Sequence, residues 1–593
     1  MQLLISIILV FYSTAYSQSV PTESGKLHAL FTEDWQWSLQ EIPEKASILG
    51  DHRYDDRLTD LSIEAHKKRH EHERTMLERI KSIDKTRLQG QDIISYDLFL
   101  LDKQTEVDAQ QFSFGLIPIS QLSGPQYFPV TQLWGPQIDL PSLIDFMRFR
   151  DQADFRMYLK RIAGIHRYLR QLIVVMELQQ EQGWMPPALP LRSVADQINS
   201  LVVDTPDKSI FFSPFQKMSP QIEEREMETL KREARTIIAD SVVTAFKMLG
   251  EYWTKTYLPA CRENIAVDAL KGGKEFYTFQ SRRETTTRMT PQEIHDIGKR
   301  EVARIRNEME KVIEQVKFKG SFREFIAFLR TDKQFYHSTA DALVTGYRDI
   351  CKRADAELPK LFAQLPRNQY GVRETPAHMA PSATTGFYNP GAADGSRPGW
   401  FLANTYKLDM RPKYEMEALA LHEAVPGHHL QVSRAQELSE LPDFRRNAGY
   451  TAYVEGWGLY AESLGSEMGF YTDPYSRFGQ LTYEMWRACR LVVDTGMHLF
   501  GWSRQQAIDL MKENTAKSEQ DIVVEIDRYI VWPGQALAYK IGDLKIKELR
   551  AKAARALGDR FDIRTFHNAL LDNGPLPLGL LETRMDAWIN SQK

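Results

Sequence analysis

Apolar residues recur at helical spacing along most of this chain, and this periodicity constrains its fold more than any other feature. Between residues 290 and 316, isoleucine, methionine and valine recur at intervals of three, four, seven and eight positions, which places them on one face of a helix. Thr290, Pro291 and Glu293 supply helix start signals: an N-cap, a proline in the first turn and a capping box. We therefore predict one long amphipathic helix over this stretch.

Six more stretches show similar periodicity, whereas alternating strand patterns are scarce. The predicted helical stretches are residues 55–85, 140–180, 220–255, 340–363, 475–500 and 536–556. The predicted fold class is mainly α, a large helical fold of two lobes with a central cleft. The N-terminal helical lobe is expected to cover residues 18–285. The C-terminal lobe, residues 286–593, holds the candidate chemistry described below.

Two stretches rich in proline and glycine interrupt the helical pattern. Residues 115–140 cannot form a continuous helix, because each proline removes a backbone donor and restricts the residue before it. Residues 381–406 form a long loop whose last part, residues 399–406, is apolar and aromatic. We interpret that last part as a short strand, a small β element that could align a peptide by strand addition.

The charge balance argues against one class of partner. The chain has 75 basic and 79 acidic residues, so its formal net charge is only -4. Proteins that bind nucleic acid through its phosphates carry a basic surface, so no nucleic-acid partner is expected. With 42% hydrophobic and 26% charged residues, the composition is that of an ordinary globular protein.

The first residues have the layout of a secretory signal peptide. An apolar run over residues 3–12 is followed by small and polar residues, which predicts a cleaved signal over residues 1–17. The protein is therefore expected to be exported, to the periplasm or the extracellular medium. No cysteine follows the run, so a lipid anchor is not expected. Beyond it no segment has the length and apolarity of a membrane helix, so no membrane contact is expected after cleavage.

Residues 422–429 read HEAVPGHH and begin like a zinc-hydrolase motif. Such a motif places two histidines four positions apart on a helix, with a glutamate after the first as general base. His422 and Glu423 fit the first ligand and the base, but position 426 is proline. Pro426 offers no N–H to the carbonyl of His422, and its ring clashes with that carbonyl, so the helix must kink or bulge there.

The Pro-Gly pair decides which histidine is the second ligand. In a regular helix, His428 would point to the wrong side and His429 would lie roughly 10 Å further along the axis. If Pro426 and Gly427 form an excursion of two residues, His428 falls where the ligand at i+4 belongs, and glycine tolerates the backbone angles needed. We therefore predict His428 as the ligand and keep His429 as the alternative.

A third ligand must be a carboxylate, because cysteine does not supply it. The three cysteines lie far apart: Cys261, Cys351 and Cys489. In NAGYTAYVEGWGLYAESLG, Glu455 and Glu462 are seven positions apart and share a helix face. An acidic residue among apolar neighbours needs a partner, and Glu455 has such neighbours. We predict Glu455 as the third ligand and Glu462 as a carboxylate that supports a ligand from behind.

Several segments resemble a known family. The segments are HEAVPGHHLQ, YVEGWGLYAE, RLVVDTGMH and RYIVWPGQALAYKIG. They resemble the bacterial family called domain of unknown function 885, which is grouped with the gluzincin metallopeptidases. YVEGWGLYAE is also similar to the segment of thimet oligopeptidase-like enzymes in which the first glutamate is the third zinc ligand, which implies that role for Glu455. The resemblance covers most of the chain and implies a metallopeptidase-like fold.

A third set of candidates lies on the helix predicted over residues 475–500. Arg490, Asp494 and His498 are spaced by four and share a helix face. They could orient a metal ligand or polarise the scissile carbonyl. A structural salt-bridge ladder is the alternative interpretation.

Further candidates flank the WPGQ turn at residues 532–535. Arg528, Tyr529 and Tyr539 lie on either side of it, and an arginine or tyrosine aimed at an oxyanion would stabilise it. A core tyrosine is the alternative for each tyrosine. The predicted catalytic residues are Glu423, His498, Arg528 and Tyr539.

Together these features predict an exported zinc-dependent peptidase with one Zn2+ per chain. Zinc held by His422, His428 and Glu455 would activate a water, and Glu423 would accept its proton and pass it to the leaving amine. The expected substrate is a peptide or small amide. One alternative keeps the zinc but hydrolyses a non-peptide amide or an ester. Another is a non-catalytic exported helical binding protein, which would have no reason to retain stoichiometric zinc.

Overall fold

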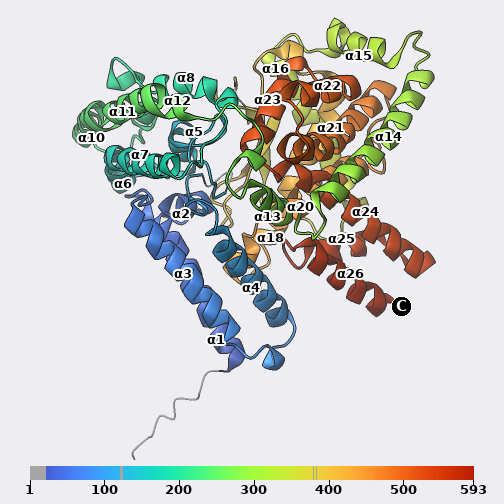
Figure 1. The fold of residues 1–593 in the computed structure, drawn as a ribbon, viewed down its shortest axis with the longest axis horizontal. Helices are drawn as coiled ribbons and strands as arrows, with labels where there is room; N and C mark the ends of the chain where they lie inside the picture. Colours follow the sequence, from blue (N-terminus) through green and yellow to red (C-terminus); the bar gives the residue numbers. More distant parts are fainter. Residues whose placement is uncertain (1–21, 121–123, 378, 382) are drawn as a thin grey trace, which may run out of the picture.

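A computed structural model describes residues 22–120, 124–377, 379–381 and 383–593. The predicted signal peptide, residues 1–17, lies outside the described residues. The fold is mainly α, as predicted, with many helices and one small sheet (Figure 1). None of the helices in the described ranges is both long and apolar enough to span a membrane.

The strongest helical prediction is confirmed in detail. Helix α14 (Pro291–Gln315) starts with the predicted capping box, in which Thr290 and Glu293 each bond the backbone N–H of the other. Three other predicted stretches also hold one long helix each: α16 (Ala340–Leu361), α21 (Pro474–Leu499) and α24 (Ala538–Leu557).

Three predicted stretches are less regular than expected. The stretch over residues 55–85 holds a helix only from its ninth position, and the other two are divided. Their helices are α3 (Ile63–Lys81), α6 (Gln152–Ala163), α7 (Ile165–Glu181), α10 (Glu224–Ile237) and α11 (Thr244–Tyr252). A wider π turn separates α10 from α11. Residues 115–140 are not a continuous helix, as predicted; they hold an isolated bridge and the start of α5 (Pro136–Ser142).

A three-stranded sheet precedes the HEAVPGHH segment. Its strands are β1 (Tyr370–Glu374), β2 (Gly386–Asn389) and β3 (Gly399–Ala403). The strand predicted within residues 399–406 is therefore confirmed in shortened form as β3. It is the central strand, parallel to β1 and antiparallel to β2. Because both of its sides are paired, the expectation that this run adds a peptide strand is wrong.

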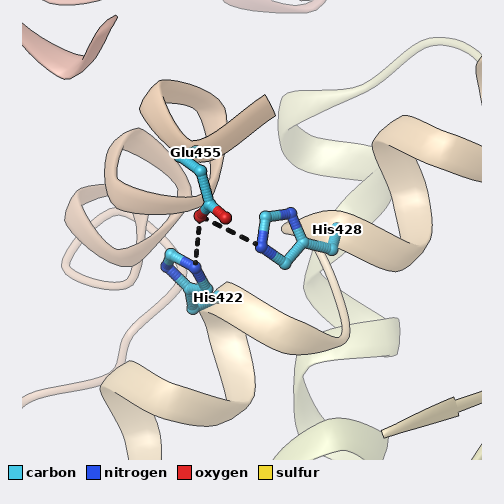
Figure 2. A group of neighbouring side chains, drawn as sticks. All are labelled: His422, His428 and Glu455. Carbon is cyan, nitrogen blue, oxygen red and sulfur yellow. Dashed lines mark ion pairs between the residues drawn. The ribbon is translucent and has the colours of Figure 1, made fainter. Parts of the chain in front are cut away.

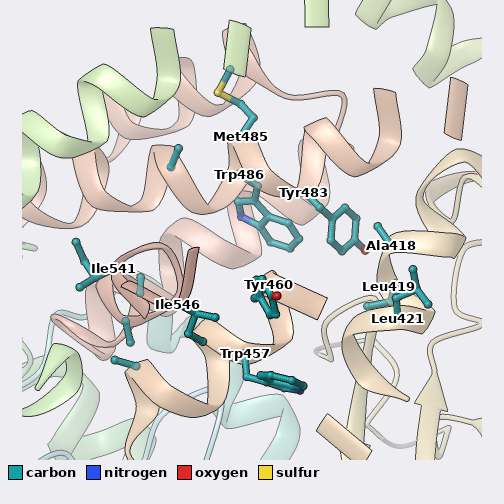
Figure 3. Close-up of a cluster of buried hydrophobic side chains, with 14 of the residues drawn as sticks. Ala418, Leu419, Leu421, Trp457, Tyr460, Tyr483, Met485, Trp486, Ile541 and Ile546 are labelled. Atoms are coloured by element: carbon teal, nitrogen blue, oxygen red, sulfur yellow. The ribbon is translucent and has the colours of Figure 1, made fainter. Parts of the chain in front are cut away.

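Four helices surround the segment with the candidate chemistry: α17 (Met416–Glu423), α20 (Thr451–Leu464), α21 and α24. Figure 3 shows part of the core between them, in which aromatic side chains of α20 and α21 lie among aliphatic side chains of α17 and α24. Helices α20 and α24 touch backbone to backbone, since a Cβ on Gly456 would lie 2.5 Å from the backbone of Gly542. This close approach brings the start of α24 beside Glu455.

Buried hydrophobic residues of the described ranges form three clusters. One consists mainly of N-terminal residues around α6, α7, α10 and α11 and also includes Val531. A small one joins α1 (Glu23–Glu41), α3 and α4 (Gln91–Ala109). The largest contains residues from both sides of position 285, including Phe276 and Ile294. The two parts therefore share core at the predicted boundary, and the lobe boundary and central cleft stay predictions.

Candidate metal centre

The backbone turns away from helical geometry inside HEAVPGHH. Helix α17 ends at Glu423, and α18 (His428–Gln436) begins at His428. Gly427 packs against the end of α17 so closely that a Cβ there would lie 1.9 Å from the carbonyl oxygen of His422. Glycine is thus needed for this approach. The indole N–H of Trp457 donates to the carbonyl of Pro426 at 2.8 Å and fixes the turn to α20.

Three side chains converge at this turn, as Figure 2 shows. The Nε2 atoms of His422 and His428 lie 3.4 and 3.5 Å from the same oxygen, Oε2 of Glu455. The three candidate ligand atoms all lie within 4.8 Å of one another. The side chains of His422, His428 and Glu455 are 3%, 12% and 19% exposed, respectively, so Glu455 and His428 face the more open side.

These separations fit a shared metal ion better than hydrogen bonds. Atoms that bind one tetrahedral zinc at about 2.0–2.2 Å lie roughly 3.3–3.6 Å from each other, whereas a charge-assisted N–H···O bond is about 2.8 Å long. The buried Oε2 of Glu455 also has no hydrogen-bond partner among the described residues. Such an atom is costly unless something binds it, and two imidazoles with one carboxylate are a donor set that zinc accepts.

A further carboxylate holds the first histidine in place. Oε1 of Glu462 lies 2.8 Å from Nδ1 of His422, and the Glu462 side chain is fully buried. Nδ1–H donation to a carboxylate leaves the lone pair of Nε2 free for a metal. The guanidinium of Arg487 lies 3.2 Å from the same Oε1. The structure therefore puts Glu462 in the supporting position predicted for it and adds Arg487 behind it.

Electrostatics at the centre favour a cation. Burial lowers the pKa of His422, but the carboxylates of Glu455 and Glu462 outweigh burial and raise the pKa of His422 to about 9 overall. Burial raises the pKa of Glu423, and the two histidines offset this only in part. Three carboxylates and the single guanidinium of Arg487 leave an excess of negative charge when the histidines are neutral. A divalent cation would balance it.

His429 points elsewhere. Its Nδ1 lies 2.9 Å from the hydroxyl of Tyr388 on β2, and its Nε2 lies 3.1 Å from the carbonyl of Asn368. Burial lowers the pKa of His429 to about 4, so it is held neutral between these partners. The geometry brings His428, and not the alternative His429, to Glu455.

Tyr539 lies on the first turn of α24, the helix whose Gly542 packs against Gly456, the residue after Glu455. Burial raises the pKa of its phenol, and the charge of Glu455 raises it further. The guanidinium of Arg490 lies over the Tyr539 ring at 4.1 Å from its centroid. Of the predicted oxyanion-stabilising residues, Tyr539 lies on the helix that packs directly against the helix of Glu455.

Arg528 is occupied by other partners. Its Nη1 donates to Gln535 at 2.6 Å, and its Nε and Nη2 donate to Glu525 at 3.3 and 3.2 Å. Tyr529 also donates to Glu525, at 2.7 Å. These bonds tie α23 (Glu519–Val531) to the WPGQ turn, so Arg528 acts on the centre at most through its charge.

His498 is not grouped with the three candidate ligands, and the structure gives its nitrogens other partners. Its Nδ1 accepts from the backbone N–H of Val267 at 3.2 Å, and its Nε2 lies 2.9 Å from the carbonyl of Tyr529. Both nitrogens are used by backbone, and burial lowers the pKa of His498 to about 4. Its neighbour in the predicted ladder, Asp494, accepts from Tyr277 at 2.5 Å. Arg490 pairs with Glu525 instead, so among the described residues the three side chains do not form the alternative salt-bridge ladder with one another.

Sequence reasoning missed two residues of the centre. Arg487 gave no separate signal, because charged residues are common on long helices. Gly458 did give a signal, because it is one of two glycines inside an otherwise helical segment. A glycine in such a position usually has a packing reason. That reason is now clear, since a Cβ on Gly458 would lie 2.6 Å from Cε1 of His422.

The fold and the cluster define a large α-helical protein with a histidine and glutamate centre of the kind that holds a metal. The chain belongs to the family described as bacterial protein of unknown function (DUF885), whose model matches residues 43–585. The earlier resemblance to that family is thus confirmed, while a kinship with the gluzincins stays a proposal. No curated protein matches the chain.

Two solved structures are similar over nearly the whole chain. A crystal structure of "the putative lipoprotein from Colwellia psychrerythraea" is 28% identical, with a TM-score of 0.90 over 96% of this chain and 100% of that one. A second, "a putative lipoprotein of unknown function from Shewanella oneidensis", is 18% identical, with a TM-score of 0.64 over 95% of this chain and 99% of that one. The second likeness concerns the fold alone.

Proposed function

We propose that this protein is an exported zinc-dependent hydrolase that cleaves peptide bonds. The observation that carries the proposal is the convergence of His422, His428 and Glu455 on one point, with Glu423 directly after the first histidine. Zinc bound there would act as a Lewis acid that polarises a carbonyl and acidifies a water. The same ligands would also accept other divalent transition metals.

Glu423 is the proposed proton carrier. Its side chain is buried, and burial raises its pKa, as suits a group that must both take and give a proton near neutral pH. In hydrolysis, the water oxygen forms a bond to the carbonyl carbon while the water proton moves to the Glu423 carboxylate. The proton then passes to the amide nitrogen as the C–N bond breaks. Glu423 is thereby returned to its starting state.

Tyr539 is the proposed stabiliser of the charge that develops on the carbonyl oxygen. A phenol donates a hydrogen bond to such an oxygen, and the packing of the start of α24 against α20 beside Glu455 supports this role. The raised pKa keeps the phenol protonated, so it remains a donor. Arg528 is not included, because its donors are engaged by Glu525 and Gln535.

Two further points support the proposal from outside the centre. The pattern of ligands resembles that of the gluzincins apart from the Pro-Gly insertion, so a distant kinship is part of the proposal. Export is supported by the apolar run over residues 3–12 and by the description of the similar structure from Colwellia psychrerythraea as a "putative lipoprotein". We propose the periplasm or the extracellular medium as its place of action.

The test compares turnover and zinc content in a Glu423→Gln variant. Purified zinc-loaded protein is incubated with a mixture of peptides, and products are followed by mass spectrometry. Removing the proton acceptor should lower turnover by about a hundredfold to ten-thousandfold while zinc stays bound. Glu440→Gln, which alters an exposed glutamate, is the matched control and should change neither. Peptide cleavage that survives in Glu423→Gln would contradict the mechanism.

A further inference from the structure

Two buried arginines beside the candidate centre share one carboxylate. Arg490 on α21 donates from Nη2 to Oε2 of Glu525 at 3.0 Å, and from Nε to the hydroxyl of Tyr529 at 2.7 Å. Arg528 on α23 donates to the same Oε2 at 3.2 and 3.3 Å. The three charged side chains are 3%, 2% and 7% exposed for Arg490, Glu525 and Arg528.

This arrangement leaves one positive charge unbalanced. Two guanidinium groups and one carboxylate sum to an excess of one positive charge, and an uncompensated buried charge is costly. The neighbouring Asp494 does not compensate it by contact, because within the described part of the chain it forms no ion pair with either arginine; it accepts instead from Tyr277 and from the N–H of Gly534. An anion bound here would remove the imbalance.

Arg490 also has a donor to spare. Its Nη1 is buried and has no acceptor in the described ranges, although a buried N–H almost always finds one. The guanidinium lies over two aromatic rings, 4.1 Å from the centroid of Tyr539 and 4.8 Å from that of Trp486. An arginine held flat by aromatic rings is preorganised to donate to a carboxylate.

The spare donor is linked to the candidate ligands through the side chains around Tyr539. The ring of Tyr539 contacts Arg490, and Arg487 on the same helix as Arg490 pairs with Glu462, which holds His422. Arg487, one turn before Arg490 on α21, also lies near Tyr539, with its Cζ 6.0 Å from the ring centroid. It too has an unpartnered buried atom, Nε, among the described residues. The excess positive charge thus faces the end of the site marked by Tyr539.

We propose that Arg490, supported by the charge of Arg528, binds the C-terminal carboxylate of a peptide substrate. This inference rests on the proposed function and specifies its substrate class. The preferred substrates are therefore peptides cleaved close to a free C-terminus.

The experiment measures binding without turnover. Zinc-loaded Glu423→Gln protein is titrated by calorimetry with N-acetylated tripeptides of alanine, leucine and phenylalanine, each as a free acid and as the C-terminal amide. A third arm uses tripeptide amides that end in glutamate. The free acids should bind about tenfold to a hundredfold more tightly than the amides, as one buried charge-assisted bond allows. Adding Arg490→Gln should abolish that preference, and Arg490→Lys should restore part of it.

Each outcome decides the inference. Equal affinity for acids and amides, or no binding by any peptide, overturns the carboxylate subsite even where zinc remains bound and the proposed function stands. Preference for the glutamate amides alone overturns the C-terminal assignment in favour of an acidic side chain. If Arg490→Gln does not fold, the acid and amide affinities of the Glu423→Gln protein still decide. Absence of zinc from that protein is a failure of the proposed function and is measured separately.

Discussion

Two regions of this molecule bring histidine and carboxylate atoms together, and they differ in which cation balances the negative charge of the carboxylates. The metal centre has His422, His428 and Glu455; the second cluster has Asp34 and Glu73 with His72. In the second cluster the distances are those of hydrogen bonds, since Nε2 of His72 lies 2.7 Å from Oδ1 of Asp34. In the metal centre the comparable distances are 3.4 and 3.5 Å.

A lysine explains this difference. The ammonium of Lys103 lies 3.0 Å from Asp34, 2.7 Å from Glu73 and 3.1 Å from Glu106. The second cluster thus contains its own cation, carried by helix α4. The metal centre has no lysine in contact with Glu455 among the described residues, and Oε2 of Glu455 lacks a hydrogen-bond partner there. Similar residue types therefore form a structural network in one region, whereas in the other they support the proposed metal site.

The largest effect is expected from a methyl group placed against the first ligand. In Gly458→Ala, the added Cβ would lie 2.6 Å from Cε1 and 2.8 Å from Nε2 of His422, so the ring must move and stoichiometric zinc should be lost. Zinc per chain is measured by mass spectrometry. Gly449→Ala is the control, because a Cβ there meets nothing within 4 Å. Zinc retained at one per chain in Gly458→Ala would show that this ring does not bind it.

Removing the cation of the second cluster should destabilise the fold. Lys103→Met leaves Asp34 and Glu73 buried without their partner, which costs about 3–5 kcal/mol when a buried pair is broken. The free energy of unfolding is measured in urea. The control is Lys81→Met, whose exposed pair with Glu78 is worth about 1 kcal/mol or less. A loss as small as that of the control would mean that Lys103 does not balance the cluster.

A smaller effect, on zinc affinity, is expected from a change in Glu462, the carboxylate that bonds the first ligand, His422. Glu462→Gln keeps the shape of the side chain but weakens its bond to Nδ1 of His422, and loss of such support typically lowers metal affinity 10- to 100-fold. Zinc affinity is measured by competition with a chelator, with Glu440→Gln as the exposed control. Unchanged affinity in Glu462→Gln would mean that the bond does not tune the site.

The smallest effect concerns acid stability of the second cluster. Burial raises the pKa of Asp34, but Lys103 and His72 lower it by more, so the pKa is below its value in the unfolded chain. Asp34 therefore contributes stability that is present above the unfolded pKa and lost as the pH falls through the folded pKa. In Asp34→Asn the unfolding free energy should fall less steeply between pH 5 and about pH 3 than in the unaltered protein. An equal slope would contradict this contribution.

Local sequence signals predicted the parts of the fold that local physics determines. The capping box of α14 and the break at Pro426 follow from side chains and backbone within a few residues. The same argument placed His428 at the position of the second ligand. Strands β1 and β2 gave no such signal, because short strands depend on partners that lie elsewhere in the chain.

Contacts between distant segments account for what the sequence did not predict. Arg487 reaches Glu462 from another helix, and Lys103 meets carboxylates of α1 and α3. His498 illustrates the converse, because its spacing suggested chemistry while its two nitrogens bond the backbone of residues 267 and 529. Residue type and spacing identify candidates, and the partners of the converging atoms distinguish the candidate metal centre from the second cluster.

The most direct test of the comparison is the zinc content of purified protein and of three histidine variants, measured by mass spectrometry after zinc is supplied. One zinc per chain is predicted for the unaltered protein, for His429→Ala and for His72→Ala, and none for His428→Ala. Zinc that remains in His428→Ala but is lost from His429→Ala or His72→Ala, or zinc that is absent from all four proteins, would contradict the metal centre proposed here.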